Sequence, residues 1–191
     1  MNFHEQIIEL LKSISGSLGA KRDETKGDKQ LIIEKCLVFL IFFLMKNVKN
    51  QNVIAEYPNF DRFVGDVLSI KIKNLQTYIL IFIAEIYKDN YHLLIKLNKS
   101  QDEEVMIFTK LKLKLPEELQ KRNFSYCIYF FQLLIYFFKI KSATLLQNQH
   151  WIFQEIFQSE NIDIGKAFIN SLGYVKDLNI MDQLKGNTIF V

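Results

Sequence analysis

Cysteine and histidine are scarce in this chain. Its 191 residues include two cysteines, Cys36 and Cys127, and three widely separated histidines, His4, His92 and His150. A zinc site needs several Cys or His ligands at short spacing, so the sequence predicts neither a metal site nor a bound cofactor. Both cysteines stand in apolar runs, where a free buried thiol is the expected state.

Glycine and proline are also rare, with seven and two copies. A phosphate-binding loop requires closely spaced glycines before a helix, and the nearest approach, residues 16–19, lacks the Lys-Ser/Thr that should follow. The acidic pairs 103–104 and 117–118 lie in highly charged sequence of the kind found on surfaces, and no nucleophile elbow is present. Because no common catalytic motif is visible, we expect a protein that is not an enzyme.

Positive charge is modest. The net charge is +3 and the isoelectric point is near 8.7, less basic than is usual for a dedicated nucleic-acid-binding domain. Residues 1–16 contain two glutamates and no arginine. Neither a secretory signal nor a transit peptide is therefore recognisable, and we expect an intracellular location, cytoplasmic or nuclear.

Apolar side chains are abundant, at 49% of residues. Their helical spacing in 3–18 predicts an amphipathic helix, which is followed by a charged, mobile loop over 20–30. The next predicted helix, 31–50, is apolar on every side at its centre, 36–45. A helix of this kind is normally buried all round, and the central run, roughly 15 Å long at the helical rise, is too short to cross a bilayer.

Further helices are predicted beyond a polar connection that ends at Pro58. Asn59 is a candidate cap for a helix that runs to about Lys73, and another covers 75–99. Three very apolar runs recur along the chain, at 36–45, 77–87 and 127–138. We therefore expect a single all-α domain spanning 1–191, either a multi-helix bundle or a short α-solenoid-like array of helices.

Residues 105–115 depart from this pattern. Lys110 to Leu115 alternates lysine with leucine, which is the period of a half-buried strand, and Pro116 resembles the first residue of a new helix. The last five residues, 187–191, also have strand character. The sequence thus allows one extended strip near 105–115 that pairs with the C-terminus, with an irregular connection as the alternative.

Residues 124–140 form the most apolar long segment. The less apolar side chains fall at helical spacing, at Ser125, Tyr129, Gln132, Tyr136 and Lys139, which predicts a helix with most of its surface buried. A membrane span is the alternative, although the segment is at the lower length limit and charges stand close to both ends. Additional helices are predicted over 142–160 and 162–173, with a final turn or two near 177–184.

Two features are candidate binding sites. The first is the densest basic patch of the chain: Lys110, Lys112, Lys114, Lys121 and Arg122. On a strand, the three lysines in 110–114 would project from one face, where they could meet phosphates or an acidic protein. The alternative is that they guard a strand edge against unwanted pairing.

The second is Trp151. In the predicted helix 142–160 it lies with Glu155 and other polar residues, away from the apolar stripe. A tryptophan outside the core stripe is typical of a protein–protein anchor, and the alternative is that the C-terminal tail folds over it.

The function expected from these observations is a protein-interaction module or a structural subunit of a larger assembly. Three very apolar helices exceed what a small bundle normally needs, so a hetero- or homo-oligomeric protein partner is expected to cover the excess. Two other classes stay open: a membrane-associated subunit that uses 124–140, and a basic accessory protein that binds nucleic acid.

Overall fold

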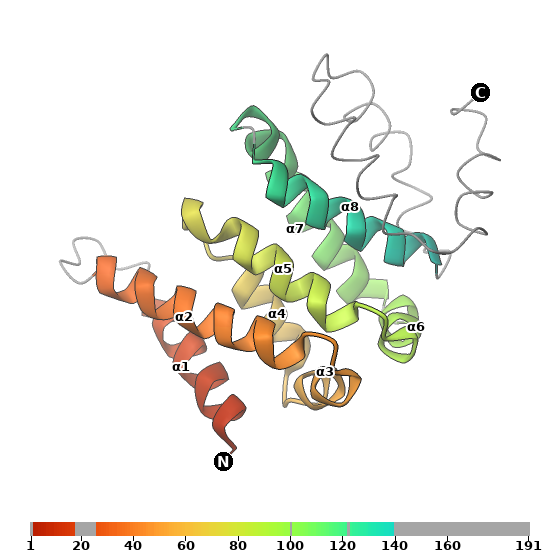
Figure 1. The fold of residues 1–191 in the computed structure, drawn as a ribbon, viewed down its shortest axis with the longest axis horizontal. Coiled ribbons are helices and arrows are strands. Elements are labelled where there is room, and N and C mark those ends of the chain that lie inside the picture. The colour runs from red at the N-terminus through yellow and green to blue at the C-terminus, as the bar shows by residue number, and fades with distance from the viewer. Residues whose placement is uncertain (1, 18–25, 100, 122, 140–191) are drawn as a thin grey trace. The chain divides into compact units, whose positions relative to one another are not determined.

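The computed structural model describes residues 2–17, 26–99, 101–121 and 123–139. These residues are helical with short connections and contain no strand, which confirms the all-α prediction (Figure 1). The chain divides into two compact units, 1–93 and 94–191. That residues 1–191 form a single domain stays a prediction.

The first unit is built on a central helix, α5 (Gln76–Tyr87). Around it stand α2 (Lys26–Leu44), α3 (Val48–Ala55), α4 (Phe60–Leu68) and the 3₁₀ turn η1 (Lys73–Leu75), while α1 (Phe3–Ser17) packs against α2 and α4. Helices α2 and α5 lie side by side along most of their length (Figure 1). Helix α5 therefore has neighbours in several directions.

The apolar sequence of α5 matches this central position. Ile79, Leu80, Phe82, Ile83 and Ile86 are each at most 1% exposed. Since these positions cover more than one side of the helix, burial extends around much of its axis.

Asparagines mark two helix starts that the sequence did not predict. The Oδ1 of Asn47 accepts a hydrogen bond from the backbone N–H of Asn50 at 3.1 Å and caps α3. The helix predicted over 31–50 therefore ends at Leu44, and α3 continues into the stretch expected to be a polar connection. Similarly, Asn90 Oδ1 accepts from the N–H of Leu93 at 3.2 Å. The helix predicted over 75–99 is therefore interrupted, and α6 (Tyr91–Lys99) begins after a break at Lys88.

Other boundaries also differ from the prediction. Asn59 does precede α4, with a left-handed backbone (φ 58°) and without a capping bond from its side chain, but the helix ends at Leu68 rather than near Lys73. Helix α2 begins at Lys26, so the predicted loop 20–30 is too long at its C-terminal end. Capping and tertiary packing decide where these helices begin and end, and the apolar spacing of the sequence does not encode either.

In the second unit, α7 (Gln101–Gln120) packs against α8 (Phe124–Lys139). The strand expected near 105–115 is wrong, because this segment lies inside α7. The residues that are buried follow helical spacing: Ile107, Phe108, Leu111, Leu115 and Glu118. Alternation over six residues is too short a window to outweigh this longer helical pattern.

Pro116 lies within α7 and does not start a helix. Proline has no N–H to donate to the preceding turn. It is exposed, and the side chains of Leu115 and Glu118 on either side of it are buried. Packing of these neighbours holds the helix together through a residue that normally ends one.

Helix α8 confirms the prediction for 124–140. Its buried side chains include Tyr126, Cys127, Phe130, Phe131 and Leu134. Among the less apolar positions, Ser125 is exposed, and Tyr129, Gln132 and Tyr136 are half-buried. The side chain of Lys139 is not among those described.

Candidate protein-binding surface

Helix α2 has a buried side and an apolar side that remains exposed. The buried side carries Ile33, Cys36, Leu37, Leu40 and Leu44, each at most 3% exposed. On the opposite side lies a row that we call the outer stripe, which consists of Leu31, Lys35, Val38, Phe42 and Met45, the last of them directly after the helix.

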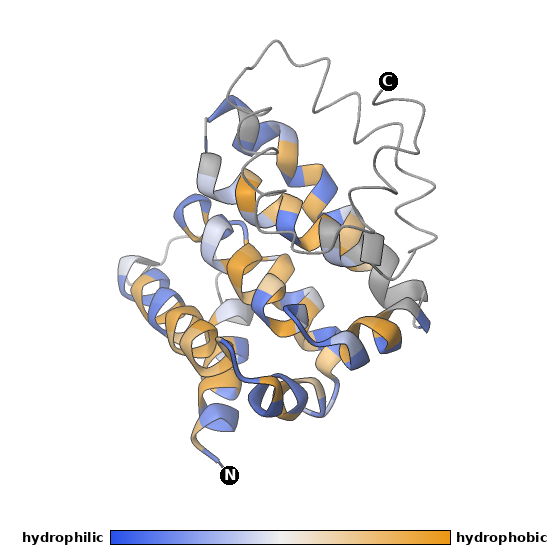
Figure 2. Cartoon of the chain, turned by 45° about the vertical axis from the view of Figure 1, so that its right-hand side comes forward, coloured by the Kyte–Doolittle hydropathy of each residue, from blue (hydrophilic) through white to orange (hydrophobic). Residues whose placement is uncertain are grey.

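Most of the outer stripe is accessible. Phe42 is 68% exposed, Leu31 is 52% exposed and Met45 is 40% exposed, while Val38 is half-buried. The second half of α2 is coloured almost uniformly hydrophobic in Figure 2. The expectation that the run 36–45 is buried on every side is therefore wrong, because α2 has neighbours on one side and α5 on several.

Aromatic side chains of α1 extend the apolar surface. The ring of Phe3 meets that of Phe39 edge-on at a centroid distance of 5.0 Å, and His4 stacks on Phe43 at 5.2 Å. Phe3 nevertheless remains 62% exposed. Because Phe39 and Phe42 are three residues apart on α2, their side chains are neighbours on its surface.

The charges near the outer stripe are mostly positive. Lys35 lies within it, Lys46 follows Met45, and Lys49 stands in the first turn of α3, all three exposed. None of these lysines forms an ion pair with a described residue. Helix α2 also carries two described acids, Asp28 and Glu34. Because the three lysines are exposed, this surface combines exposed apolar side chains with accessible ammonium groups.

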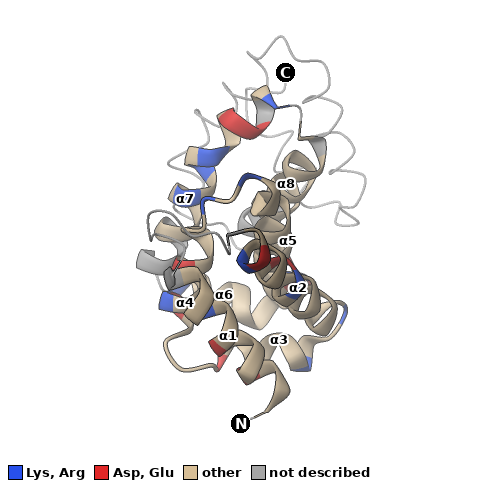
Figure 3. Cartoon of the chain, turned by 90° about the vertical axis from the view of Figure 1, so that its left-hand side faces the viewer, with Lys and Arg blue, Asp and Glu red and all other residues tan. Residues whose placement is uncertain are grey.

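The lysine patch predicted from the sequence is rearranged by the helix. At 100° per residue, Lys110 and Lys114 share a face of α7, whereas Lys112 points in another direction. Lys121 belongs to the same face, one turn beyond Glu117, and Arg122 is outside the described residues. Figure 3 shows blue bands along α7 followed by a red band toward its end, so lysines and acids occupy successive segments of this helix.

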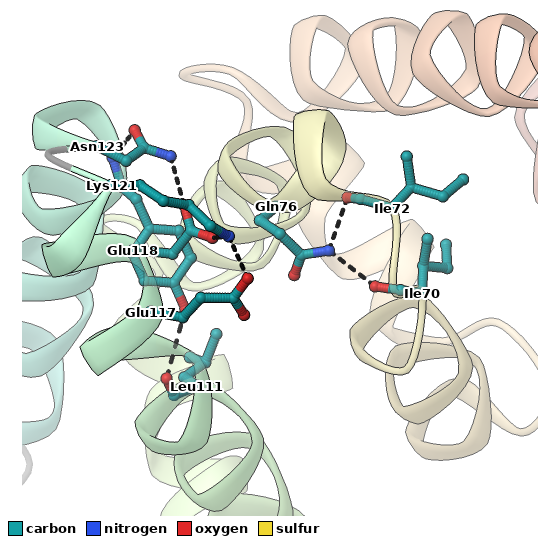
Figure 4. A network of polar contacts seen from close by, with 9 residues as sticks. Ile70, Ile72, Gln76, Leu111, Glu117, Glu118, Lys121 and Asn123 are labelled. Atoms are coloured by element: carbon teal, nitrogen blue, oxygen red, sulfur yellow. Dashed lines mark hydrogen bonds and ion pairs between the residues drawn. The ribbon is translucent and has the colours of Figure 1, made fainter.

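A polar network joins the end of α7 to the start of α8 (Figure 4). Lys121 forms ion pairs with Glu117 and with the buried carboxylate of Glu118, the latter at 2.9 Å. The Nδ2 of Asn123 donates to the other Glu118 oxygen at 2.7 Å, and its Oδ1 accepts from the N–H of Tyr126 at 3.2 Å. Both Glu118 oxygens are thus satisfied, and the network serves the α7–α8 connection.

Burial alters three ionisable groups of this unit. It lowers the pKa of Lys114 to about 8, assisted by the charge of Lys110 and opposed by Glu118 and Glu117. It raises the pKa of the Cys127 thiol to about 11 and also raises the pKa of Tyr126, each with a smaller contribution from Glu118. A thiol of this kind is protonated near neutral pH, so Cys127 is not an activated nucleophile.

A second polar cluster lies in the first unit. The Nε2 of Gln51 donates to the carbonyl oxygens of Glu85 at 2.8 Å and Lys88 at 2.9 Å. The Glu85 carboxylate pairs with Lys88 at 2.9 Å, and Asn90 donates to Asn52 at 2.9 Å. These bonds end α5 and position the turn to α6, which is a structural role.

Metal-binding side chains do not cluster in the described part of the chain. No group of three or more His, Cys, Asp or Glu residues there could hold a metal ion. Cys36 and Cys127 are both free and buried. Trp151 and Glu155 lie outside the described residues, as do the predicted helices from 142 onward and the strip 187–191, so those predictions stay untested.

No described helix is both long enough and apolar enough to cross a bilayer. Comparison with known proteins adds no relative: no protein-family model matches the chain, and no curated protein or solved structure is significantly similar to it. The outer stripe could not be picked out from the sequence because the run 36–45 of α2 is apolar on all sides. Its only local signal is Lys35, one lysine among the apolar positions.

Proposed function

We propose that this chain is a non-enzymatic interaction module, a subunit that binds another protein through the outer stripe of α2. The exposure of Phe42 carries the proposal. A phenylalanine that is 68% exposed in a row with Leu31 and Met45 presents apolar area to water, and contiguous exposed apolar surface is typical of a protein-binding site. Phe3 enlarges this surface.

The charges on α7 and the burial of α8 favour protein binding over the two alternative functions. The α7 lysines that share a face, which would carry a nucleic-acid function, stand next to Glu117 and Glu118, and both acids pair with Lys121. A phosphate-binding surface needs concentrated positive charge. The membrane alternative relies on α8, whose apolar side chains such as Phe130 and Phe131 are buried within the protein.

The test is site-specific photocrosslinking in the native cell. A photoreactive phenylalanine analogue replaces Phe42 in one version of the chain and Leu113 in another. Leu113 is a matched control because it is 75% exposed and lies on α7. We expect one defined protein to be trapped at position 42 and not at position 113.

A Phe42→Asp variant completes the experiment. It should lose the trapped protein on co-purification while keeping the helical circular dichroism and thermal transition of the parent. Equal crosslinking at both positions, or none at position 42, would overturn the proposal.

A further inference from the structure

The outer stripe has the spacing of a coiled-coil seam. Asp28, Leu31, Lys35, Val38, Phe42 and Met45 follow one another at intervals of three and four residues. This alternation is the a/d pattern by which two helices pack side chains into each other along a shared seam. Residues 28–45 present it over most of the length of α2.

Lys35 is the exception within the apolar part of this seam. It is exposed, it lies between Leu31 and Val38, and it pairs with no described acid. Covering an ammonium group with an apolar helix would remove its water without replacement, which costs free energy. A single lysine at an a position of a coiled coil specifies the register and the oligomeric state, at a cost in stability.

We infer that the outer stripe binds an amphipathic helix of another protein that carries a carboxylate opposite Lys35. The nearby Lys46 and Lys49 extend the same preference toward acidic flanks. Leu31, Val38, Phe42 and Met45 supply the apolar contact, and Lys35 rejects helices that lack the acid. This inference rests on the proposed function, since it names the kind of partner for the same surface.

A second copy of the chain fits this surface poorly. In a parallel pair, Lys35 would meet Lys35 of the other copy. In an antiparallel pair that matches residue 28 with residue 45, the two lysines stand three positions apart beside the two-fold axis, roughly 4.5 Å along the helix. Both arrangements bring two ammonium groups together, whereas a partner helix with a glutamate there removes the conflict.

Two synthetic peptides test the inference with the full chain. Both are four-heptad helices with leucine at the a and d positions, and they differ in one residue, glutamate or lysine, at the position that faces Lys35. Fluorescence anisotropy measures their affinities. We expect the glutamate peptide to bind about tenfold tighter, the ratio that corresponds to roughly 1.4 kcal/mol.

Three variants test whether the peptides bind at the outer stripe and whether Lys35 sets their charge preference. Lys35→Glu should reverse the order of the two peptides, Phe42→Asp should abolish the binding of both, and Leu113→Asp on α7 should change neither. Circular dichroism checks that each variant keeps its helices. Equal affinities for the two peptides, or an order that Lys35→Glu leaves unchanged, would refute the requirement for a carboxylate.

If the outer stripe binds something else, the experiments give different results. A dimer in sedimentation velocity that Phe42→Asp dissociates would assign the surface to a second copy, and a crosslink from position 42 within the same chain would assign it to this chain itself. Either result overturns the inference. If position 42 traps another protein but the peptides show no charge preference, the proposed function stands and the inference alone fails.

Discussion

The run 36–45 of α2 and helix α5 are both strongly apolar in sequence, and they have different surroundings. In α5, Phe82 and Ile83 are fully buried because α2, α3, α4 and η1 stand around the helix. In α2, Leu37 and Leu40 are equally buried on one side, but Phe42 on the other is 68% exposed. An apolar sequence therefore allows a helix to be buried on all sides, and the number of neighbouring helices decides whether it is buried in this way.

The largest expected effect compares one phenylalanine from each helix. Phe82→Ala should lower the free energy of unfolding by about 3–5 kcal/mol, because it removes a fully buried ring and leaves a cavity. Phe42→Ala should change it by no more than about 0.5 kcal/mol, as at other exposed positions. Urea unfolding followed by circular dichroism measures both. Similar losses for the two variants would mean that Phe42 belongs to the core.

The next largest change in the free energy of unfolding is expected from the hydrogen bonds that Gln51 donates at the end of α5. Gln51→Leu removes the amide that donates to the carbonyl oxygens of Glu85 and Lys88. Leaving buried acceptors without donors should cost about 1–3 kcal/mol. The same substitution at the exposed Lys35 of α2 provides the control and should be nearly neutral in urea unfolding. A neutral Gln51→Leu would show that water replaces these bonds.

A smaller effect extends the comparison to neighbouring residues of α7, where Leu113 is 75% exposed and Lys114 is half-buried. Burial lowers the folded-state pKa of Lys114 to about 8 from 10.5. The unfolded chain therefore binds more protons between these values, and the contribution of Lys114 to stability rises with pH across this window.

Lys114→Met should accordingly be more stable than the parent at pH 7, by less than about 1 kcal/mol after solvent screening. This advantage should shrink from pH 8 to 10.5. Cys127 and Tyr126 titrate with the opposite sign in the alkaline range, because the pKa of each is raised in the folded state. The difference between variant and parent, measured by urea unfolding at each pH, isolates Lys114. A constant difference across the window would contradict its partial burial.

The smallest expected effect on stability is at Trp151, beyond the described residues. The sequence places it off the apolar stripe of its predicted helix, so Trp151→Ala should leave the thermal transition nearly unchanged while weakening partner capture. Differential scanning fluorimetry and co-purification measure the two properties. A large drop in the melting temperature would instead place this side chain in a core, as with Phe82.

Several parts of the fold were predictable because long periodic patterns carry them. The helix in 3–17 and the helix in 124–139, with its row from Ser125 to Tyr136, were expected from spacing alone. The errors have local causes. Six alternating residues and Pro116 concealed the continuous helix α7, and the caps at Asn47 and Asn90 created helix starts within segments that looked uniform.

The candidate surface was less predictable. The sequence indicated excess apolar area but located its binding residues on a lysine patch and at Trp151. On a helix, Lys112 leaves the face shared by Lys110 and Lys114, and the outer stripe of α2 was hidden in a run expected to be covered. Which side of α2 stays exposed depends on where α1, α3 and α5 pack.

By itself, the sequence determined the helical class, because hydrophobic periodicity and helix-compatible composition are local properties that every segment carries. It also determined that apolar surface would be plentiful. Only the tertiary structure decided that α5 is enclosed, that Lys114 is more buried than Leu113, and that Phe42 faces water. Burial is a relation between segments distant in the chain, so no single segment contains the information that sets it.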